Sequence, residues 1–258
     1  MAETVFLGEP FKSLWAGKDV FAEAALIQGN EFRNREGRRT LRFTTPDGRG
    51  FFLKYHSGIG WKEVFKNLLQ FKLPVIGAGN EFHAISELTK AGVPTMTAAA
   101  FGSRGYNPAR KESFLITEEL IDMPSCEEYA ARPAPESDGE KEKIIRALAA
   151  SAGKMHALGI NHRDCYLCHY LIDRQGQELQ LRVIDLHRSQ HRKKVPMRYR
   201  IKDLAGLYFS SMDCKWITAG DRELFISVYS AFAGELSPRI WEKVEKTALK
   251  LWKKGAKG

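Results

Sequence analysis

Two polar segments, each placed directly after an apolar element, constrain this chain more than any other feature. A helical pattern over residues 140–158 is followed by the His-Arg-Asp triplet of residues 162–164. A β-rich run over residues 181–184 then ends at Asp185. Two carboxylates delivered in this way suit a general base and a magnesium ligand on either side of a transferred phosphoryl group. The pattern predicts phosphoryl-transfer chemistry.

The wording of both segments resembles one superfamily. The triplet 162–164 resembles the catalytic loop of protein-kinase-like phosphotransferases, and residues 185–187, Asp-Leu-His, resemble their metal-binding Asp-Phe-Gly motif. Over residues 161–169 and 183–188 the sequence is similar to the bacterial lipopolysaccharide core heptose(I) kinases within that superfamily. The similarity covers most of the chain. It implies an α+β fold with two lobes, an N-terminal antiparallel sheet plus a helix and a mostly helical C-terminal lobe.

The resemblance also assigns roles to residues of the C-terminal half. Asp164, flanked by His162 and Arg163, would be the base that takes the proton of the acceptor hydroxyl. Asp185 would hold Mg²⁺ between the terminal phosphates of ATP, because a hard cation prefers carboxylate oxygen. His169 stands where most relatives have a metal-binding asparagine, although imidazole is a poor direct ligand for magnesium. It is expected to bind metal through water, to donate to phosphate, or to brace Asp164.

In the N-terminal half, alternation and turn residues predict strands near residues 31–34, 40–44 and 51–56, after short helices within residues 6–28. The last strand directs the Lys54 ammonium to one face. By resemblance, Lys54 is the strand lysine that binds the nucleotide phosphates. A surface lysine remains the alternative.

A helix is predicted over residues 81–90, with Asn80 as its cap. In kinase-like folds this helix supplies a carboxylate that holds the strand lysine. Glu81 and Glu87 are the candidates, and the resemblance favours Glu81. Either glutamate is also compatible with a role as plain surface charge.

Further nucleotide contacts are expected at a turn and at a connector. Arg38 and Arg39 fall in the turn where kinase-like folds place their phosphate loop, but a solvated turn would have the same sequence. The strand over residues 113–120 leads into an acidic connector. By resemblance, the backbone of Glu118, Glu119 and Leu120 would hydrogen-bond the adenine, although a simple interlobe link would look identical.

The most cationic part of the chain follows Asp185. Arg188, Arg192, Lys193 and Lys194 suit an acceptor that carries phosphates or acidic sugars, with a solvated loop as the alternative. A second basic segment, residues 59–73, has an apolar helical flank. It would either cover the first lobe or contact an acidic membrane surface or lipid.

The remaining sequence is read as helical. Asp203 would open an apolar helix over residues 204–209, either bracing the catalytic loop from below or acting as an ordinary cap. Residues 221–252 have the pattern of two further helices. The linker-like stretch 131–140 precedes the long helix. We expect one kinase-like domain whose lobes span residues 1–120 and 121–258.

Cysteine usage suggests a reduced protein. Four cysteines are too few for a disulfide framework at this length, and Cys126, Cys165 and Cys168 are expected to be reduced thiols near the active site. A rival interpretation groups His162, Cys165, Cys168 and His169 as a zinc cluster. All four lie within eight residues, which would make a tetrahedral site cramped.

Charge and length limit the partners. A chain of 258 residues with net charge +9 and a pI near 9.3 favours an acidic partner, and charge alone does not choose among nucleic acid, an anionic membrane and a phosphate-rich substrate. The sequence shows neither a signal-peptide pattern nor a run of about 18 apolar residues. A cytoplasmic protein is therefore expected, with peripheral contact to the inner membrane surface as a further option.

The resemblance implies an ATP- and Mg²⁺-dependent kinase that phosphorylates heptose I of the lipopolysaccharide inner core. The acceptor would be an acidic glycolipid, an acidic partner protein would suit the charge, and no nucleic acid is expected. The alternatives are another core-sugar kinase, an aminoglycoside-type kinase, a protein kinase, or a non-catalytic basic module that binds membrane or nucleic acid. The cationic run disfavours an enzyme for polycationic drugs.

Overall fold

The computed structural model describes residues 3–35, 37–58, 60–61, 65, 69, 77–107, 109–134 and 138–255. The chain divides into two units. The first consists of residues 1–86 and 96–121, and the second of residues 87–95 and 122–258. Most of the basic helix predicted over residues 59–73, and the centre of the predicted linker, lie outside the described residues.

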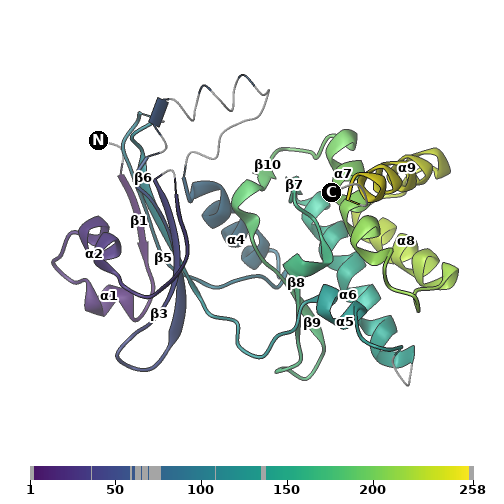
Figure 1. Ribbon diagram of the computed structural model, residues 1–258, viewed down its shortest axis with the longest axis horizontal. Helices are drawn as coiled ribbons and strands as arrows, with labels where there is room; N and C mark the ends of the chain where they lie inside the picture. Colours follow the sequence, from purple (N-terminus) through teal and green to yellow (C-terminus); the bar gives the residue numbers. More distant parts are fainter. Residues whose placement is uncertain are drawn as a thin grey trace. The chain divides into compact units, whose positions relative to one another are not determined.

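The first unit is built on a six-stranded sheet in which every neighbouring pair is antiparallel (Figure 1). Its spatial order is β1-β5-β6-β4-β3-β2. The strands are β1 (Glu3–Leu7), β2 (Asn30–Arg35), β3 (Arg38–Thr44), β4 (Gly50–His56), β5 (Ala98–Arg104) and β6 (Glu112–Glu118). The predicted antiparallel sheet, with strands at β2, β3 and β4, is confirmed.

The first strand corrects the sequence-based prediction. Phe6 and Leu7 were expected among short helices, but they belong to β1, which pairs with β5 at the edge of the sheet. Two short helices do follow, α1 (Phe11–Leu14) and α2 (Val20–Leu26). The pairing partner of β1 lies about 95 residues further along the chain, so the local pattern does not reveal it.

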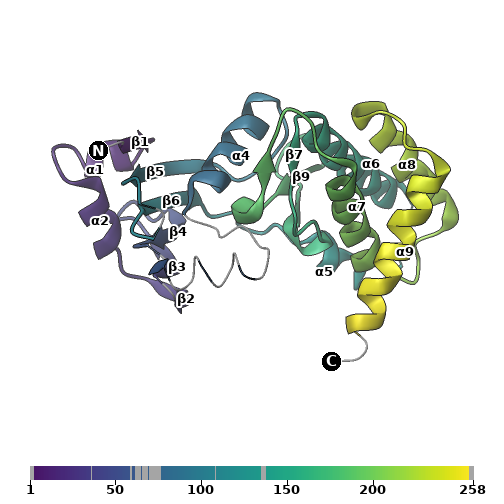
Figure 2. The same cartoon turned by 90° about the horizontal axis from the view of Figure 1, so that it is seen from above.

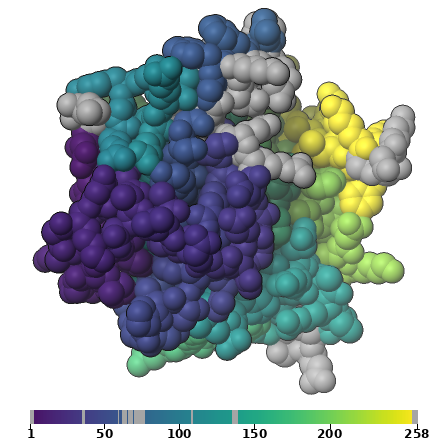
Figure 3. Space-filling model, turned by 60° about the vertical axis from the view of Figure 1, so that its left-hand side comes forward, coloured from purple at the N-terminus to yellow at the C-terminus, as the bar shows by residue number. Residues whose placement is uncertain are grey.

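One face of the sheet is buried by α1 and α2. Phe51 and Leu53 of β4 point to this face and are fully buried with Phe11 and Phe21. Burying each such side chain is worth roughly 1.5–3 kcal/mol before conformational entropy is subtracted. Figure 3 shows the outer surface of these helices in purple, next to the dark blue surface of the strands that follow.

The other face of the sheet receives the start of α4 (Gly79–Lys90). Phe82 stacks on Phe101 of β5, with ring centroids 4.1 Å apart and planes within 2°. Because side chains alternate along a strand, Lys54 points to this face while Leu53 points to the opposite one. The helix begins at Gly79, so Asn80 is a helical residue and its predicted role as the cap is wrong.

The second unit is mostly helical, as predicted. Its long helices pack in two pairs, α6 with α8 and α7 with α9 (Figure 2). The helices are α5 (Cys126–Ala130), α6 (Asp138–Ala157), α7 (Met197–Ser211), α8 (Ala219–Ala233) and α9 (Pro238–Gly255). No helix in the described part of the chain is both long enough and apolar enough to cross a membrane.

Two short two-stranded antiparallel sheets in the second unit carry the polar segments identified in the sequence. The pairs are β7 (Ile160–Asn161) with β10 (Gln190–His191), and β8 (Tyr170–Asp173) with β9 (Gln180–Val183). The helix expected to start at Asp203 starts instead at Met197. Arg198, Arg200 and Lys202 interrupt the apolar period in its first two turns, which hid this start from the sequence pattern, and Asp203 therefore lies in the helix interior.

Candidate functional site

The loop that carries the predicted catalytic residues begins at a glycine that tolerates no side chain. Gly159 follows α6 with φ +79°, and a Cβ built on it would lie 1.8 Å from the carbonyl oxygen of Arg192. The Gly159 carbonyl also accepts a hydrogen bond of 2.9 Å from the Arg192 amide. This close approach joins β7 to β10 and fixes the start of the loop.

Asp203 holds the loop from beneath. Its side chain is 1 % exposed, Oδ2 accepts the amide of His162 at 2.7 Å, and Oδ1 accepts the amide of Arg163 at 2.9 Å. Arg163 has φ +75°, a left-handed conformation that costs an L-residue roughly 1–2 kcal/mol. The charge-assisted hydrogen bond that its amide donates to Asp203 offsets that cost. The predicted brace is confirmed, and the alternative of an ordinary helix cap is wrong.

Asp164, the candidate base, faces an arginine. Nη1 of Arg188 lies 2.7 Å from Oδ1 and 3.0 Å from Oδ2 of Asp164. Burial, and then repulsion from Arg188, lower the pKa of Arg163, so two guanidinium groups share this region. Arg188 therefore neutralises the carboxylate directly, where the sequence had suggested only a contact to substrate.

Asp185 and His169 form a second pair of polar side chains, and their oxygen and nitrogen atoms are candidate metal ligands. Asp185 has φ +56°, and its Oδ2 lies 3.7 Å from Nε2 of His169, while Oδ1 bonds Nδ1 of His187 at 2.8 Å. His169 Nδ1 donates to the carbonyl oxygen of Asp164 at 2.6 Å, so in the neutral imidazole the lone pair on Nε2 faces Asp185. A ring nitrogen bonded to a backbone carbonyl is typical of metal-binding histidines. The Asp185 carboxylate and Nε2 of His169 could together bind one divalent cation, and the carboxylate oxygens suit Mg²⁺.

His162 acts within the protein. Its Nε2 donates to the carbonyl oxygen of Ile184 at 3.0 Å, and its ring stacks on His169 with centroids 5.4 Å apart. Burial lowers the pKa of His162 below its ordinary value, which favours the neutral ring. His162 thus ties the loop that carries Asp164 to the segment that carries Asp185.

The zinc-cluster alternative is wrong. The described residues, which include all four proposed ligands, contain no group of three or more His, Cys, Asp or Glu arranged to hold a metal ion. Cys165 is buried with its Sγ 3.2 Å from the hydroxyl of Tyr170. Burial raises the pKa of the Cys165 and Cys168 thiols and so disfavours the thiolates that zinc requires. All four cysteines have free thiols.

In the first unit, the strand lysine pairs with a buried carboxylate. Nζ of Lys54 lies 2.7 Å from Oε1 of Glu81, whose side chain is 1 % exposed. Glu87 pairs instead with Lys90, at 2.9 Å on the surface of the same helix. Of the two candidate glutamates, Glu81 is therefore the one that pairs with Lys54.

The two arginines predicted in a turn lie in strand β3. Arg39 bonds Oε1 of Glu31 at 2.6 Å and donates to the carbonyl oxygens of Ala25 and Ile27 at 3.1 and 2.6 Å. Its guanidinium holds α2 and the following turn against the sheet. The turn position predicted for Arg38 and Arg39 is wrong, because the strand pairing with β2 extends two residues further than the alternation indicated.

Two backbone amides of the predicted connector already donate hydrogen bonds within the first unit. The amide of Glu118 donates to the carbonyl of Thr97, and the amide of Glu119 donates to that of Gly50, both at 3.0 Å. The carboxylates pair with arginines of the same unit, Glu118 with Arg49 and Glu119 with Arg42. The half-buried Leu120 follows them.

The basic run contains two kinds of side chain. Arg192 bonds Oδ1 of Asn161 at 2.6 Å and lies 4.7 Å from the ring centroid of Tyr199, so it stabilises the loop. Lys193 and Lys194 are exposed. These two lysines are the cations of the run that project into solvent.

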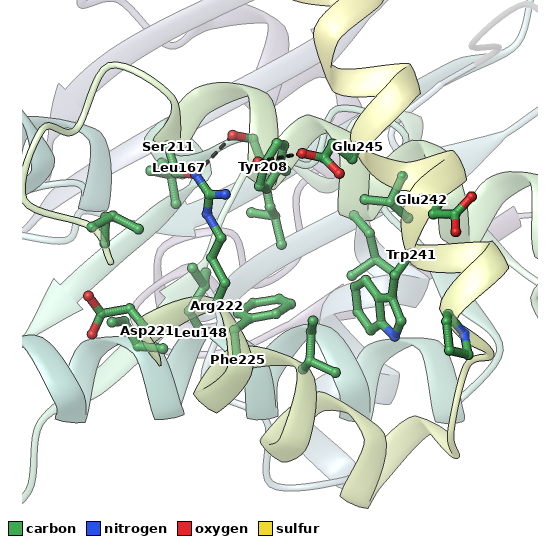
Figure 4. Close-up of a pocket in the computed structure, with 17 residues that line it drawn as sticks. Leu148, Leu167, Tyr208, Ser211, Asp221, Arg222, Phe225, Trp241, Glu242 and Glu245 are labelled. Atoms are coloured by element: carbon green, nitrogen blue, oxygen red, sulfur yellow. Dashed lines mark hydrogen bonds between the residues drawn. The ribbon is translucent and has the colours of Figure 1, made fainter. Parts of the chain in front are cut away.

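Sequence reasoning missed a cavity of about 480 Å³ among α6, α7, α8 and α9 (Figure 4). Its wall is mainly apolar and includes Leu148, Leu207, Ile217, Phe225, Trp241 and Val244. Tyr208 and Arg222 lie at its polar side, with the guanidinium 4.8 Å from the Tyr208 ring centroid. The helical pattern marks the inward faces, but it does not show that four such faces leave a space between them.

Comparison with known proteins identifies the family. Residues 23–229 match the lipopolysaccharide kinase (Kdo/WaaP) family. The chain belongs to this family. It is 48% identical over 229 residues to "Lipopolysaccharide core heptose(I) kinase WaaP" of Pseudomonas aeruginosa PAO1, covering 86% of this chain and 85% of that protein. It is also 48% identical over 231 residues to the protein of the same name in Escherichia coli K12, covering 87% and 86%.

A solved structure gives the same relationship for the fold of this Kdo/WaaP family member. The structure, described as "WaaP in complex with acyl carrier protein", matches with a TM-score of 0.80 and 39% identity over 96% of this chain and 99% of that one. The predicted fold, family and enzyme class, a phosphotransferase with a kinase-like fold, are confirmed. Family membership favours a lipopolysaccharide kinase over the drug-kinase and non-catalytic alternatives.

Proposed function

We propose that this Kdo/WaaP kinase transfers the γ-phosphoryl group of ATP to a hydroxyl of heptose I in the lipopolysaccharide inner core. The supporting observation is 48% identity to proteins named for that activity over 86% of this chain. The loop geometry is compatible with it, since Asp164 sits on a backbone held by a buried carboxylate. Fold alone would not choose the acceptor.

In the proposed reaction Asp164 takes the proton of the heptose hydroxyl as its oxygen attacks the γ-phosphorus. The bond between that phosphorus and the β–γ bridging oxygen breaks, and ADP leaves. Arg188 lies against Asp164 and would exchange this partner for phosphate oxygens as the charge moves. Mg²⁺ would neutralise the terminal phosphates, held by Asp185 directly and by His169 directly or through water.

The nucleotide is assigned to the first unit by analogy with the superfamily. Lys54, oriented by Glu81, would bind the phosphates, and Arg38 is kept as a further phosphate contact. Arg39 is left out because its guanidinium already makes three bonds within the unit. Since the amides of Glu118 and Glu119 are used in the sheet, Leu120 is the preferred backbone contact to adenine.

The decisive experiment is transfer from radiolabelled ATP to dephosphorylated core lipid, with an aminoglycoside, a protein and no acceptor as parallel reactions. Label in the core lipid alone supports the heptose assignment, and acid hydrolysis of the product locates it on the sugar. Label in the protein or the aminoglycoside, with none in the lipid, contradicts it.

Lys193 and Lys194 are proposed to attract the acidic acceptor. Changing both to glutamate should raise KM for core lipid by about 30-fold or more and leave KM for ATP nearly unchanged, because two cations contribute about 1 kcal/mol each at a charged surface. Steady-state kinetics at two salt concentrations measure the effect. Lys253→Glu with Lys254→Glu is the matched control, since it changes net charge equally on exposed residues of α9. An equal change in both variants would remove the local role.

A carrier protein is proposed as a second partner. A related structure contains acyl carrier protein, and this chain has a largely apolar cavity of about 480 Å³ in its second unit. An acyl chain is an apolar ligand of the kind that such a wall binds. The net charge of +9 suits an acidic carrier. Because ATP and carrier protein are cytoplasmic reagents, we place the enzyme at the cytoplasmic face of the inner membrane.

The cavity proposal is tested at Ile217, a half-buried residue of its wall. Ile217→Trp should reduce retention of acylated carrier protein on the immobilised kinase by about tenfold or more. The indole fills space that an acyl chain needs, and overfilling a packed space costs about 1–3 kcal/mol. Ile217→Ala, which enlarges the same space, should retain the carrier. Carrier without an acyl chain is the reference. Equal retention by both variants would argue against an acyl chain in the cavity.

A further inference from the structure

A fully buried tyrosine on α8 lies next to the cavity. Tyr229 stacks with Phe225, at 6.2 Å between centroids and 9° between planes, and meets the Trp241 ring edge to face at 5.8 Å. Phe225 and Trp241 both line the cavity and are drawn in Figure 4. The ring of Tyr229 is therefore a second layer behind the cavity wall. A change in the position of either wall residue must be accommodated by it, because protein interiors are close-packed.

The hydroxyl of Tyr229 begins a chain of hydrogen bonds that ends at the catalytic loop. It lies 2.8 Å from Nδ1 of His156 on α6, whose Nε2 lies 3.3 Å from Oδ2 of Asp203. Asp203 in turn accepts the amides of His162 and Arg163. Three buried side chains thus connect α8 to the two residues that precede Asp164.

The direction of this chain follows from its donors. Burial raises the pKa of Tyr229 to about 12, so the hydroxyl keeps its proton at neutral pH. Nε of Arg200 has only a proton to offer and donates to that oxygen at 2.9 Å. Because the Asp203 carboxylate accepts, Nε2 of His156 carries a proton that faces it, and the tyrosine proton can point to Nδ1. Every member of the chain is satisfied in this arrangement.

We propose that Tyr229 and His156 are positioning residues for the catalytic loop, and that they couple its geometry to the wall of the apolar cavity. An apolar ligand that shifts Phe225 or Trp241 shifts Tyr229, and the displacement reaches the loop amides through His156 and Asp203. The connection to catalysis depends on the proposed kinase function. The coupling itself is a property of the second unit and can be measured without turnover.

The chain of hydrogen bonds from Tyr229 to Asp203 is tested by two substitutions of His156, each of which introduces a side-chain amide. His156→Gln places its amide nitrogen near the position of Nε2 and can still donate to Asp203, whereas His156→Asn places it near Nδ1 and cannot. Hydrogen exchange of the His162 and Arg163 amides should be about 3- to 30-fold faster in His156→Asn than in His156→Gln. The value of kcat should fall by a similar factor, with KM for ATP unchanged. Equal exchange in the two variants would overturn the positioning role.

The coupling between the cavity wall and the loop is tested by two matched substitutions on α8. Phe225→Leu removes the ring that stacks on Tyr229, while Phe232→Leu makes the same change at a residue of α8 that is 43% exposed and does not line the cavity. Loop-amide exchange should rise in Phe225→Leu and stay within about twofold of wild type in Phe232→Leu. Tyr229→Phe keeps the ring and removes the hydroxyl, so it should match His156→Asn. Faster exchange in Phe232→Leu as well, or in neither variant, would contradict the coupling. Because exchange requires no acceptor, this failure is distinct from failure of the heptose assay.

Discussion

Asp164→Asn is expected to lower kcat for phosphoryl transfer by about 10²–10⁴-fold, the range that a positioned general base contributes. Asparagine preserves the shape of the side chain and still offers an oxygen to Arg188, but it does not take the proton of the acceptor hydroxyl. Radiolabel transfer to core lipid measures the loss. Circular dichroism and thermal unfolding should be close to wild type, because partly exposed ion pairs contribute only about 0–1 kcal/mol.

The control for this substitution is Glu142→Gln on α6. Glu142 pairs with Arg146 at 2.7 Å, both side chains are about half exposed, and neither is assigned to the site. The same change of a carboxylate to an amide should leave kcat within about twofold there. Full turnover by a well-folded Asp164→Asn protein would remove Asp164 from the role of base. A loss caused by unfolding would show in the thermal transition instead.

The sequence predicted those elements of the fold whose pattern is local. Residues 40–44 alternate between polar and apolar side chains and are followed by a turn and the β-rich run of residues 51–56, and the long apolar period of α6 is visible without a partner. β1 was missed because only its pairing with β5 makes it a strand. The start of α7 was missed because Arg198, Arg200 and Lys202 interrupt the apolar period in its first turns. Both errors concern information that is not contained in a short window of sequence.

In the candidate site, too, the features with a local sequence pattern were predicted and those that depend on tertiary contacts were not. His162, Arg163, Asp164 and Asp185 could be located because residue order alone places them at the ends of a helix and a strand. The arginine that pairs with Asp164, the three bonds of Arg39, and the bonds from Tyr229 to Asp203 depend on distances that folding creates. The cavity is a further example, since apolar periodicity says which faces meet and not how completely they fill the space.

Lys54→Met should lower kcat for transfer by about 10²–10³-fold, the range measured when one charge-stabilising donor is removed. It should also destabilise the protein by about 3–5 kcal/mol, because Glu81 is buried and loses the ammonium 2.7 Å away. Urea unfolding measures the second effect and ATP-dependent kinetics the first. The two losses have different physical origins, so a second substitution can separate them.

Lys54→Met with Glu81→Met replaces the whole pair by apolar side chains. Replacing both members of a buried pair is often neutral or stabilising, so the free energy of unfolding should recover to within about 1 kcal/mol of wild type. Activity should not recover, because no cation is restored for the phosphates. Glu87→Met with Lys90→Met is the control, since it removes a surface pair of the same helix α4. If the buried double variant regains both stability and turnover, Lys54 serves only to neutralise Glu81, and another residue must bind the nucleotide phosphates.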